Sequence, residues 1–363
     1  MLFRSPDALI MSDPGLIMMV REHFPDMPIH LSVQANAINW ATVKFWKDYG
    51  LSRVILSREL ALEEIEEIQK NVPEIELEVF VHGALCMAYS GRCLLSGYMN
   101  KRDANQGACT NACRWEYKIH KAQEDANGDV IPVQQIESSK QCCSNQVEDN
   151  LVQSVLVQRN DEEMFAAEED EHGTYFMNSK DLRAIQHVDR LTHMGIASLK
   201  IEGRTKSYFY CARTAQIYRK AIDDALSGQP FDSSLMDLLE GLANRGYTEG
   251  FLRRHVHSDY QNYEDGSSHF DYQQFCGEVI ERNGDYVRVE VKNRFLVGDT
   301  LELMTPKGNL VFTLTEMRDL KGHPIDNAKG SGHIVEIPLS ADIDIAYALL
   351  IRHLPHAKTQ LKT

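Results

Sequence analysis

The sequence predicts an α/β protein with a parallel sheet, followed by a small antiparallel β domain. Two observations lead to this fold class. Up to Glu202, short apolar runs alternate with stretches of helical period, which is the pattern of strands joined by helical crossovers. From about Phe275 the period changes to two, so that apolar and polar residues alternate as in antiparallel strands with one buried face.

Five segments are predicted to form the strands of the parallel sheet. Each is a short apolar run bounded by polar or turn-forming residues. They are residues 7–11, 29–34, 53–57, 77–82 and 197–202. Between the third and fourth of these strands, Leu62, Ile65 and Ile68 fall on one helical face, which favours a helix packed on the sheet.

The first predicted strand begins only a few residues after Met1, and five strands do not close an eight-stranded barrel. The sequence therefore offers no upstream neighbour for residues 7–11, and natural proteins avoid such unprotected sheet edges. Either the sheet is open, or the chain lacks the N-terminal strands of a barrel. In the second case we expect the chain to fold poorly or to be inactive until those strands are restored.

Residues 275–354 are predicted to form the antiparallel domain, as a small barrel or sandwich. Turn signals such as Asn283-Gly284 and Lys307-Gly308 separate its alternating runs. The polar segment 259–274 is the predicted linker, and residues 355–363 form a tail. Residues 1–258 then make up the α/β domain.

The composition is that of a globular protein, with 43% hydrophobic and 25% charged residues. No run reaches the roughly 18 apolar residues that a membrane helix needs. The N-terminal segment has no export signal, so we expect a cytoplasmic protein with no membrane partner. The net charge of −15 at first argues against nucleic acid, but seven of the carboxylates are concentrated in residues 161–171.

Two segments are locally basic. Residues 91–121 hold six Lys or Arg against two acids, and residues 200–220 hold six against one. Because phosphates respond to charge within a Debye length, these segments are candidate RNA surfaces. The candidate contacts are Lys101, Arg102, Arg114, Lys206 and Arg213. The alternative, that both segments are ordinary solvated faces, stays open.

Four cysteines follow the fourth strand with the spacing Cys-x6-Cys-x15-Cys-x3-Cys: Cys86, Cys93, Cys109 and Cys113. Thiolates are soft ligands for zinc or for iron–sulfur clusters. Structural zinc sites usually have two tight cysteine pairs. Here only the second pair is tight, which favours a cluster.

The chain has eight cysteines in all, and without an export signal they do not indicate a disulfide framework. Cys211 lies in a helical stretch and Cys276 at the start of a strand, so both are predicted to be packing residues. The vicinal Cys142 and Cys143 are predicted to be loop residues rather than ligands.

Polar residues follow the predicted strands at their C-terminal ends, which meet at one mouth of a parallel barrel. Arg58 and Arg204 could hold a small di-acid through bidentate pairs, with Gln34 as a further substrate contact. Taken singly, each of these residues is as often a structural cap as a functional group.

Three further residues at strand ends, Glu59, His82 and Glu202, could serve as acid–base catalysts. A hydrolase finds less support, because the sequence contains neither His-Glu-x-x-His nor Gly-x-Ser-x-Gly. It has no Walker-type phosphate loop either.

The segment HGALCMAYSGRCLLSGYMNKRDANQGACTNACR, residues 82–114, resembles the signature of the U32 family, long filed as peptidases or collagenase-like proteases. Residues 32–40 (SVQANAINW), 56–65 (LSRELALEEI) and 199–223 are also similar to that family. The resemblance runs from Asp7 to near the end of the chain and includes the family's C-terminal β domain. The family's first barrel strands have no counterpart here.

The resemblance implies an incomplete (β/α)8-type barrel that carries an iron–sulfur cluster of the [4Fe-4S] type. Cys86, Cys93 and Cys109 match three cluster ligands of the family, and Cys113 is the expected fourth. The resemblance further implies hydroxylation of the wobble uridine of tRNA to 5-hydroxyuridine, with prephenate or a derivative as co-substrate. The alternatives are a U32-type peptidase, or a cluster-bearing RNA-binding subunit whose chemistry belongs to a partner.

Overall fold

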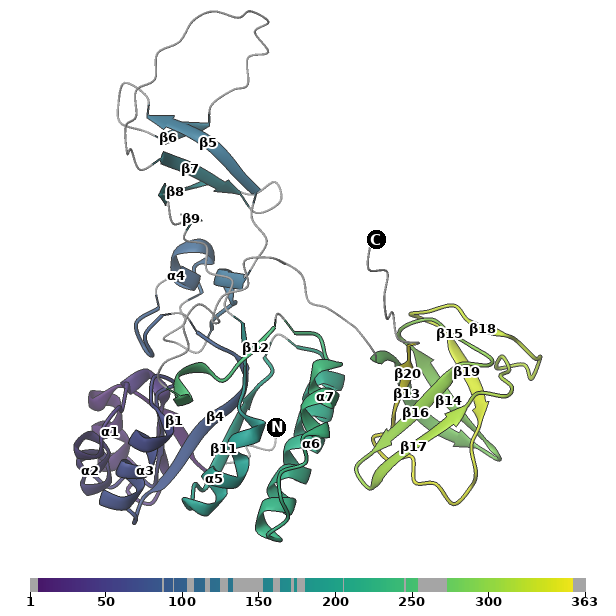
Figure 1. The fold of residues 1–363 in the computed structure, drawn as a ribbon, viewed down its shortest axis with the longest axis horizontal. Helices are drawn as coiled ribbons and strands as arrows, with labels where there is room; N and C mark the ends of the chain where they lie inside the picture. Colours follow the sequence, from purple (N-terminus) through teal and green to yellow (C-terminus); the bar gives the residue numbers. More distant parts are fainter. Residues whose placement is uncertain are drawn as a thin grey trace, which may run out of the picture. The chain divides into compact units, whose positions relative to one another are not determined.

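The computed structural model describes residues 6–86, 88–93, 95–102, 108–114, 118–124, 130–132, 153–158, 164–170, 173–174, 180–204, 206–244, 246–253 and 273–354 (Figure 1). The chain forms two compact units. One comprises Met1–Leu85, Asp181–Val256 and Ser267–Thr363, and the other comprises Cys86–Lys180 with His257–Gly266. This division falls inside the predicted α/β domain. The predicted tail and nearly all of the predicted linker lie outside the described residues.

The predicted parallel strands all form, within one sheet. They are β1 (Leu9–Met11), β2 (Ile29–Leu31), β3 (Arg53–Ile55), β4 (Glu76–Ala84) and β11 (Ser198–Glu202). The first four are parallel neighbours in chain order, and β11 also pairs with β4 in parallel. The prediction of an α/β protein with a parallel sheet is therefore confirmed.

Two short strands of this sheet were not predicted. β10 (Asp181–Arg183) runs antiparallel to β4, and β12 (Tyr247–Thr248) is parallel to β10. With three and two residues, they are too short to show a period in the sequence.

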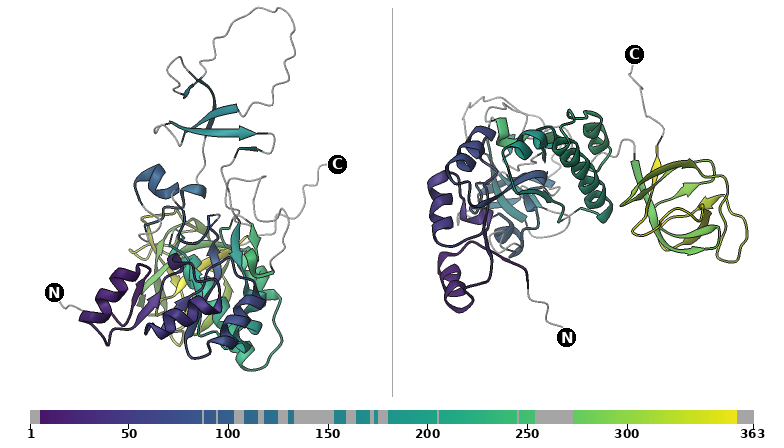
Figure 2. Two further views of the ribbon diagram at one scale, coloured as in Figure 1. Left: turned by 90° about the vertical axis from the view of Figure 1, so that its left-hand side faces the viewer. Right: turned by 90° about the horizontal axis from the view of Figure 1, so that it is seen from below.

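Helices pack around this sheet (Figure 2). Several of them begin at a residue whose side chain caps the helix. They are α1 (Pro14–His23), α2 (Trp40–Asp48), α3 (Leu62–Asn71), α5 (Val188–His193), α6 (Tyr208–Leu226) and α7 (Ser234–Glu240). Asp13, Asn39 and Ser207 cap α1, α2 and α6 by accepting backbone N–H bonds. The predicted apolar face of α3 is buried in the core.

β1 lies at one end of the sheet, and among the described strands it pairs with β2 alone. Ile10, at its centre, is 59% exposed, and Leu16 and Met19 on α1 are exposed as well. The described sheet therefore has an apolar edge at β1, where the sequence predicts an unprotected strand.

The second unit contains the segment that carries the four predicted ligands, residues 86–114, which we call the cysteine segment. It also contains an antiparallel sheet that was not predicted. The unit holds α4 (Leu95–Asn100), β5 (Lys118–Glu124), β6 (Val130–Pro132), β7 (Gln153–Gln158), β8 (Met164–Asp170) and β9 (Gly173–Thr174). The strands lie in the order β6-β5-β7-β8-β9. β8 coincides with the acidic stretch 161–171, whose charges obscure any alternation of apolar residues.

The C-terminal residues form the predicted antiparallel domain. Its main strands are β13 (Gln273–Asn283), β14 (Tyr286–Val291), β16 (Thr300–Thr305), β17 (Gly308–Thr313), β19 (Ile334–Pro338) and β20 (Leu349–His353). They lie in the order β17-β16-β20-β13-β14-β19, and β15 (Phe295–Leu296) pairs separately with β18 (Asn327–Ala328). None of the described helices is both long and apolar enough to span a membrane.

Candidate functional site

Two arginines and one glutamate meet at the C-terminal ends of β3 and β11. Nη2 of Arg58 lies 2.6 Å from Oε2 of Glu202, and Nη2 of Arg204 lies 3.5 Å from Oε1 of the same carboxylate. The guanidinium carbon of Arg58 also lies 3.6 Å from the ring centroid of Phe80, a cation–π contact. Three residues predicted from the strand ends are therefore in contact, with two positive groups against one negative.

Gly83 allows β4 and β11 to approach closely enough to form this cluster. Its φ is +102°, and a Cβ at this position would lie 2.0 Å from the carbonyl oxygen of Glu202. Glu202 pairs with Gly83 just after a register shift between Lys200 and Ile201. Irregularities of this kind re-aim side chains at the end of a sheet, and here only glycine fits the contact.

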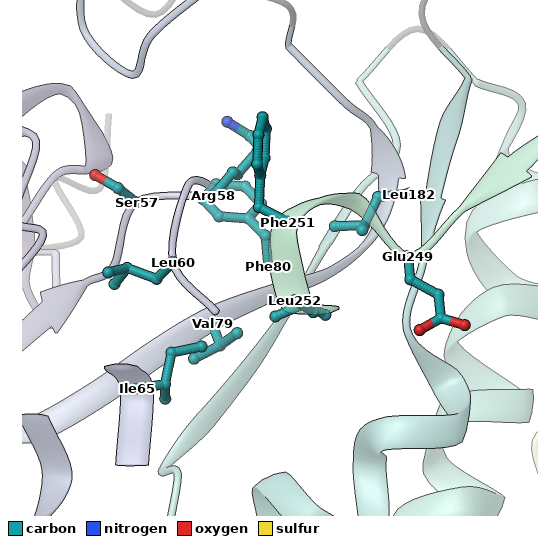
Figure 3. A pocket seen from close by; sticks show the side chains of 10 residues that line it. All are labelled: Ser57, Arg58, Leu60, Ile65, Val79, Phe80, Leu182, Glu249, Phe251 and Leu252. Atoms are coloured by element: carbon teal, nitrogen blue, oxygen red, sulfur yellow. The ribbon is translucent and has the colours of Figure 1, made fainter. Parts of the chain in front are cut away.

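A small pocket opens beside Arg58 (Figure 3). Leu60, Phe80, Phe251 and Leu252 supply much of its apolar wall, and Glu249 adds a carboxylate. An arginine at the edge of an apolar wall suits a ligand that is anionic and partly apolar.

The polar neighbours of this pocket are held by other side chains. Glu249 accepts a hydrogen bond of 2.8 Å from Nε2 of His187, and Ser57 donates one of 2.9 Å to Oδ1 of Asn36. Gln34 lies in the 3₁₀ turn Val33–Ala35, and Glu59 directly follows Arg58. Both are partly buried, and their predicted roles stay predictions.

His82 is buried rather than placed at an open mouth. It is 1% exposed, and the rings of Tyr210, Tyr218 and Tyr247 surround it at centroid distances of 5.4–5.7 Å. Burial lowers the pKa of His82 to about 3, so the ring is neutral at physiological pH. The prediction that His82 is an accessible acid–base group does not agree with this position.

The side chain of Lys206 is held by other residues of the chain. Its Nζ lies 3.1 Å from Oδ2 of Asp181, which is 0% exposed, and donates to the carbonyl oxygen of Ala243 at 2.9 Å. The Lys206 N–H also closes a turn onto the carbonyl oxygen of Gly203. Lys206 therefore anchors the loop that carries Arg204, and the predicted RNA contact is not supported by its position.

Arg213 is likewise buried, at 1% exposure. Its two terminal nitrogens donate to the two carboxylate oxygens of Glu302 at 2.9 and 2.6 Å, and His353 lies 3.0 Å from the same carboxylate. This bidentate pair joins α6 to β16 within the first unit. Arg213 is thus held by Glu302 on a buried face of α6, and this position does not support its prediction as an RNA contact.

The four predicted ligands Cys86, Cys93, Cys109 and Cys113 are not joined in disulfides and are partly buried. Ser96 on α4, which is nearly fully buried, ties the segment together by donating to the carbonyl oxygen of Arg102 and accepting from the N–H of Thr110. Next to it, the N–H of Asn111 donates to Sγ of Cys109 at 3.4 Å.

The chemistry of these four thiols fits an iron–sulfur cluster. However, in the part of the chain that the structure describes, no three His, Cys, Asp or Glu side chains gather closely enough to hold a metal ion. The geometry of a bound cluster is therefore not formed by the described residues, and we derive no chemical step through it. Cys142 and Cys143 lie outside the described residues.

The basic residues of the cysteine segment differ from Lys206 and Arg213. Arg92, Lys101 and Arg102 are exposed, while Arg114 lies in the 3₁₀ turn Ala112–Arg114. The first three side chains are therefore accessible to a phosphate.

Sequence reasoning missed Gly83, Ser96, Asp181 and Phe251. Asp181 and Ser96 act through partners distant in the chain, so no local pattern marks them. Gly83 had a usable signal, since a glycine inside an apolar strand indicates a bulge or a close backbone contact.

Comparison with known proteins adds to this geometry. Residues 4–262 match the profile of peptidase family U32, and residues 271–352 match that of the family's C-terminal domain. The chain is 64% identical to tRNA hydroxylation protein P of Escherichia coli (strain K12), over 97% of this chain and 80% of the relative. It is 61% identical to tRNA hydroxylation protein P of Haemophilus influenzae, over 98% and 79%.

A more distant relative has a different RNA in its name. The 23S rRNA 5-hydroxycytidine C2501 synthase of Escherichia coli is 27% identical, over 82% of this chain and 39% of the relative. The similarity thus extends to proteins named for the hydroxylation of two kinds of RNA.

Proposed function

The chain belongs to peptidase family U32, and from this premise we propose that it is an enzyme of tRNA hydroxylation. The observation that carries the proposal is the 64% identity to tRNA hydroxylation protein P over almost the whole chain. The finer proposal, based on the family resemblance, is conversion of the wobble uridine to 5-hydroxyuridine in the cytoplasm. The parallel sheet, the strand-end cluster and the exposed cations of the cysteine segment are compatible with this role.

We propose that Arg58 and Arg204 bind a small di-acid of the prephenate type, with Gln34 as a further contact. Both guanidinium groups lie beside Glu202, and a ligand carboxylate would pair with Arg204 while Arg58 stays on Glu202. The apolar wall of the adjacent pocket would accept the ligand's carbon frame. Glu202, already hydrogen-bonded to Arg58, and Glu59 are the proposed acid–base groups.

We propose that Cys86, Cys93, Cys109 and Cys113 hold an iron–sulfur cluster of the [4Fe-4S] type. Four thiols and a backbone donor at Cys109 support this assignment. When bound, the cluster would supply electron transfer. Anaerobically purified protein is expected to contain iron and sulfide, whereas stoichiometric zinc without iron would contradict the assignment.

We propose that Lys101, Arg102 and Arg114 contact RNA phosphates. Lys101 and Arg102 are exposed, and they lie in the same segment as the cysteines. Phosphate contacts of this kind position an RNA without reading its sequence.

We also propose that the parallel sheet is part of a β/α barrel whose next strand pairs with β1. The exposed apolar residues Ile10, Leu16 and Met19 support this, because a neighbouring strand and helix would cover them. Amide hydrogen exchange tests the idea. In a protein that includes the neighbouring strand, slow exchange along both edges of residues 9–11 is expected, and fast exchange at the outer edge of β1 would contradict the idea.

The peptidase activity in the family's name finds less support in this chain. Among the described residues, His187 is bonded to Glu249 and His82 to Tyr218, so neither serves a serine or cysteine nucleophile. Catalysis by nucleophile and base needs such a contact.

The proposal is tested by mass spectrometry of tRNA nucleosides from a bacterial strain that lacks its own tRNA hydroxylation protein. A protein that combines this chain with the strand neighbouring β1 is expected to restore 5-hydroxyuridine, while Cys86→Ser and Glu202→Gln lower it at least about tenfold, the effect of losing roughly 1.4 kcal/mol of barrier lowering. Cys211→Ser is the cysteine control and is expected to keep activity. No restoration by that protein, in a strain that the Escherichia coli relative does restore, would contradict the proposal.

A further inference from the structure

One ring nitrogen of the buried His82 has no protein partner. Nε2 has less than 1 Å² of accessible surface, and no described residue lies within hydrogen-bond distance of it. The other nitrogen, Nδ1, lies 3.3 Å from Oη of Tyr218. Buried polar atoms in folded proteins are nearly always hydrogen-bonded, so an unpaired nitrogen at this depth indicates a missing donor.

The tautomer of the ring follows from the hydrogen bonds of Tyr218. Its hydroxyl donates its single proton to the carbonyl oxygen of Val81 at 2.7 Å, and it accepts from the N–H of Ala184 at 3.3 Å. The contact with the carbonyl, at 2.7 Å, is much shorter than the 3.3 Å contact with Nδ1, so the geometry places the tyrosine proton on the carbonyl. Nδ1 of His82 must therefore carry the hydrogen of the neutral ring, which leaves Nε2 as a lone-pair acceptor.

The surroundings of the ring restrict what can donate to this acceptor. Tyr247 uses its hydroxyl proton on the carbonyl oxygen of Leu239 at 3.1 Å. The positive charges of Lys206 and Arg183 lower the pKa of the ring, whereas the negative charge of Asp181 raises it. Two cations near the ring disfavour a third one beside it. An anion has no hydrogen to give. The hydroxyl of Tyr210, whose ring lies 5.7 Å from that of His82, makes no hydrogen bond to Nε2 either. The donor that fits is therefore a further neutral O–H group.

We propose that Nε2 of His82, which lies among the rings of Tyr210 and Tyr247, accepts a hydrogen bond from a single neutral hydroxyl group. Its source is either a buried water molecule or the hydroxyl of a small ligand. Waters at buried polar sites commonly satisfy such acceptors. The site lies at the end of β4, directly before Gly83 and the cysteine segment. The proposal goes beyond tRNA hydroxylation and does not depend on it.

Nitrogen NMR of the full chain, labelled at histidine, tests the site. The two ring signals of His82 are assigned by their loss in His82→Asn. We expect a protonated Nδ1 and an unprotonated, hydrogen-bonded Nε2, both unchanged from about pH 8 to about pH 6, across the ordinary histidine pKa. The measurement is made on the wild-type chain, so it holds even if the variant folds poorly.

Methanol, as a small hydroxyl probe, distinguishes the two sources. A hydrogen-bonded Nε2 in the chain alone identifies water, and one that forms only when methanol is added identifies a site for a ligand hydroxyl. An Nε2 that stays unbonded in both samples, or that carries the proton, would overturn the proposal.

Tyr218→Phe provides a second, independent measurement. It removes the acceptor for Nδ1, so the ring should populate both tautomers and the Nε2 signal should move towards the protonated position. A variant that keeps Nδ1 fully protonated would show that Tyr218 does not fix the tautomer, and the assignment of Nε2 as an acceptor would fall.

Discussion

The two basic segments of the chain contain equal numbers of cations, yet the fold uses them in opposite ways. In residues 200–220, each of the six Lys and Arg side chains lies within ion-pair distance of a carboxylate. The pairs are Lys200–Glu78, Arg204–Glu202, Lys206–Asp181, Arg213–Glu302, Arg219–Asp223 and Lys220–Asp224. In residues 91–121, the described cations Arg92, Lys101 and Arg102 are exposed and form no ion pair with a described carboxylate.

This difference shows that the density of charge in a sequence does not locate charge on a surface. The carboxylates that neutralise the second segment come partly from distant strands, such as Glu78 on β4 and Glu302 on β16. Of these two segments, the cysteine segment is therefore the one whose described cations have no described carboxylate partner. The following predictions test this comparison.

The largest effect is expected at the buried pair of Arg213 and Glu302. Arg213→Met leaves the Glu302 carboxylate buried beside only His353, and loss of one partner from a buried pair costs about 3–5 kcal/mol. Urea unfolding measures this loss of stability. The double variant Arg213→Met/Glu302→Leu should recover much of it. A stable Arg213→Met protein with weakened tRNA binding would instead restore Arg213 as an RNA contact.

The same pair should make the protein sensitive to acid. Burial alone would raise the pKa of Glu302, but hydrogen bonds and charge from Arg213 and His353 hold it below its usual value of 4.5. A depressed carboxyl pKa stabilises the fold above about pH 4.5 and loses that contribution as pH falls through the folded value. Below that pH, the melting temperature should fall less steeply with decreasing pH in Glu302→Gln than in the wild type. Equal slopes would contradict this assignment.

A smaller loss, about 3 kcal/mol, is expected for Lys206→Met, because the Asp181 carboxylate is left buried but Lys206 itself is partly exposed. Asp181→Asn/Lys206→Met is the matched control and should lose less than the sum of the single changes. Chemical denaturation of the four proteins gives the coupling energy. A coupling near zero would show that the pair does not anchor the loop of Arg204.

The smallest change in stability is expected on the exposed face of α6. Arg219 and Lys220 each pair with a carboxylate four residues on, and such exposed pairs contribute little to stability. Replacing both by Gln should leave the denaturant midpoint of unfolding nearly unchanged. A larger loss, measured by the same denaturation, would mean that this face packs against something else.

The sequence predicted the five parallel strands, the helix at Leu62 and the antiparallel C-terminal domain, because each has a clear hydrophobic period. It also predicted that Arg58, Arg204 and Glu202 would meet, since the carboxyl ends of parallel strands share one edge of a sheet. β10 and β12 were too short to show a period. The predicted roles of His82 and Lys206 did not anticipate burial, because burial depends on partners that are distant in the sequence.

Arg213 shows the same limit in another form. Its neighbours along the chain suggest an exposed basic helix, and its carboxylate partner lies 89 residues away on β16. Only the packed tertiary structure reveals that partner. A charge pattern in a sequence therefore becomes evidence for binding only when the structure shows which of the charged side chains are exposed and which are buried.

The central claim, that the exposed cations of the cysteine segment face tRNA, is tested most directly by the salt dependence of tRNA binding. Two variants with equal loss of charge are compared, Lys101→Gln/Arg102→Gln and Arg219→Gln/Lys220→Gln. The first should reduce the slope of log Kd against log salt concentration by about 1–2, since each phosphate contact contributes roughly 0.7–0.9. The second should leave the slope unchanged. An unchanged slope in the first variant, or an equal reduction in both, would contradict the claim.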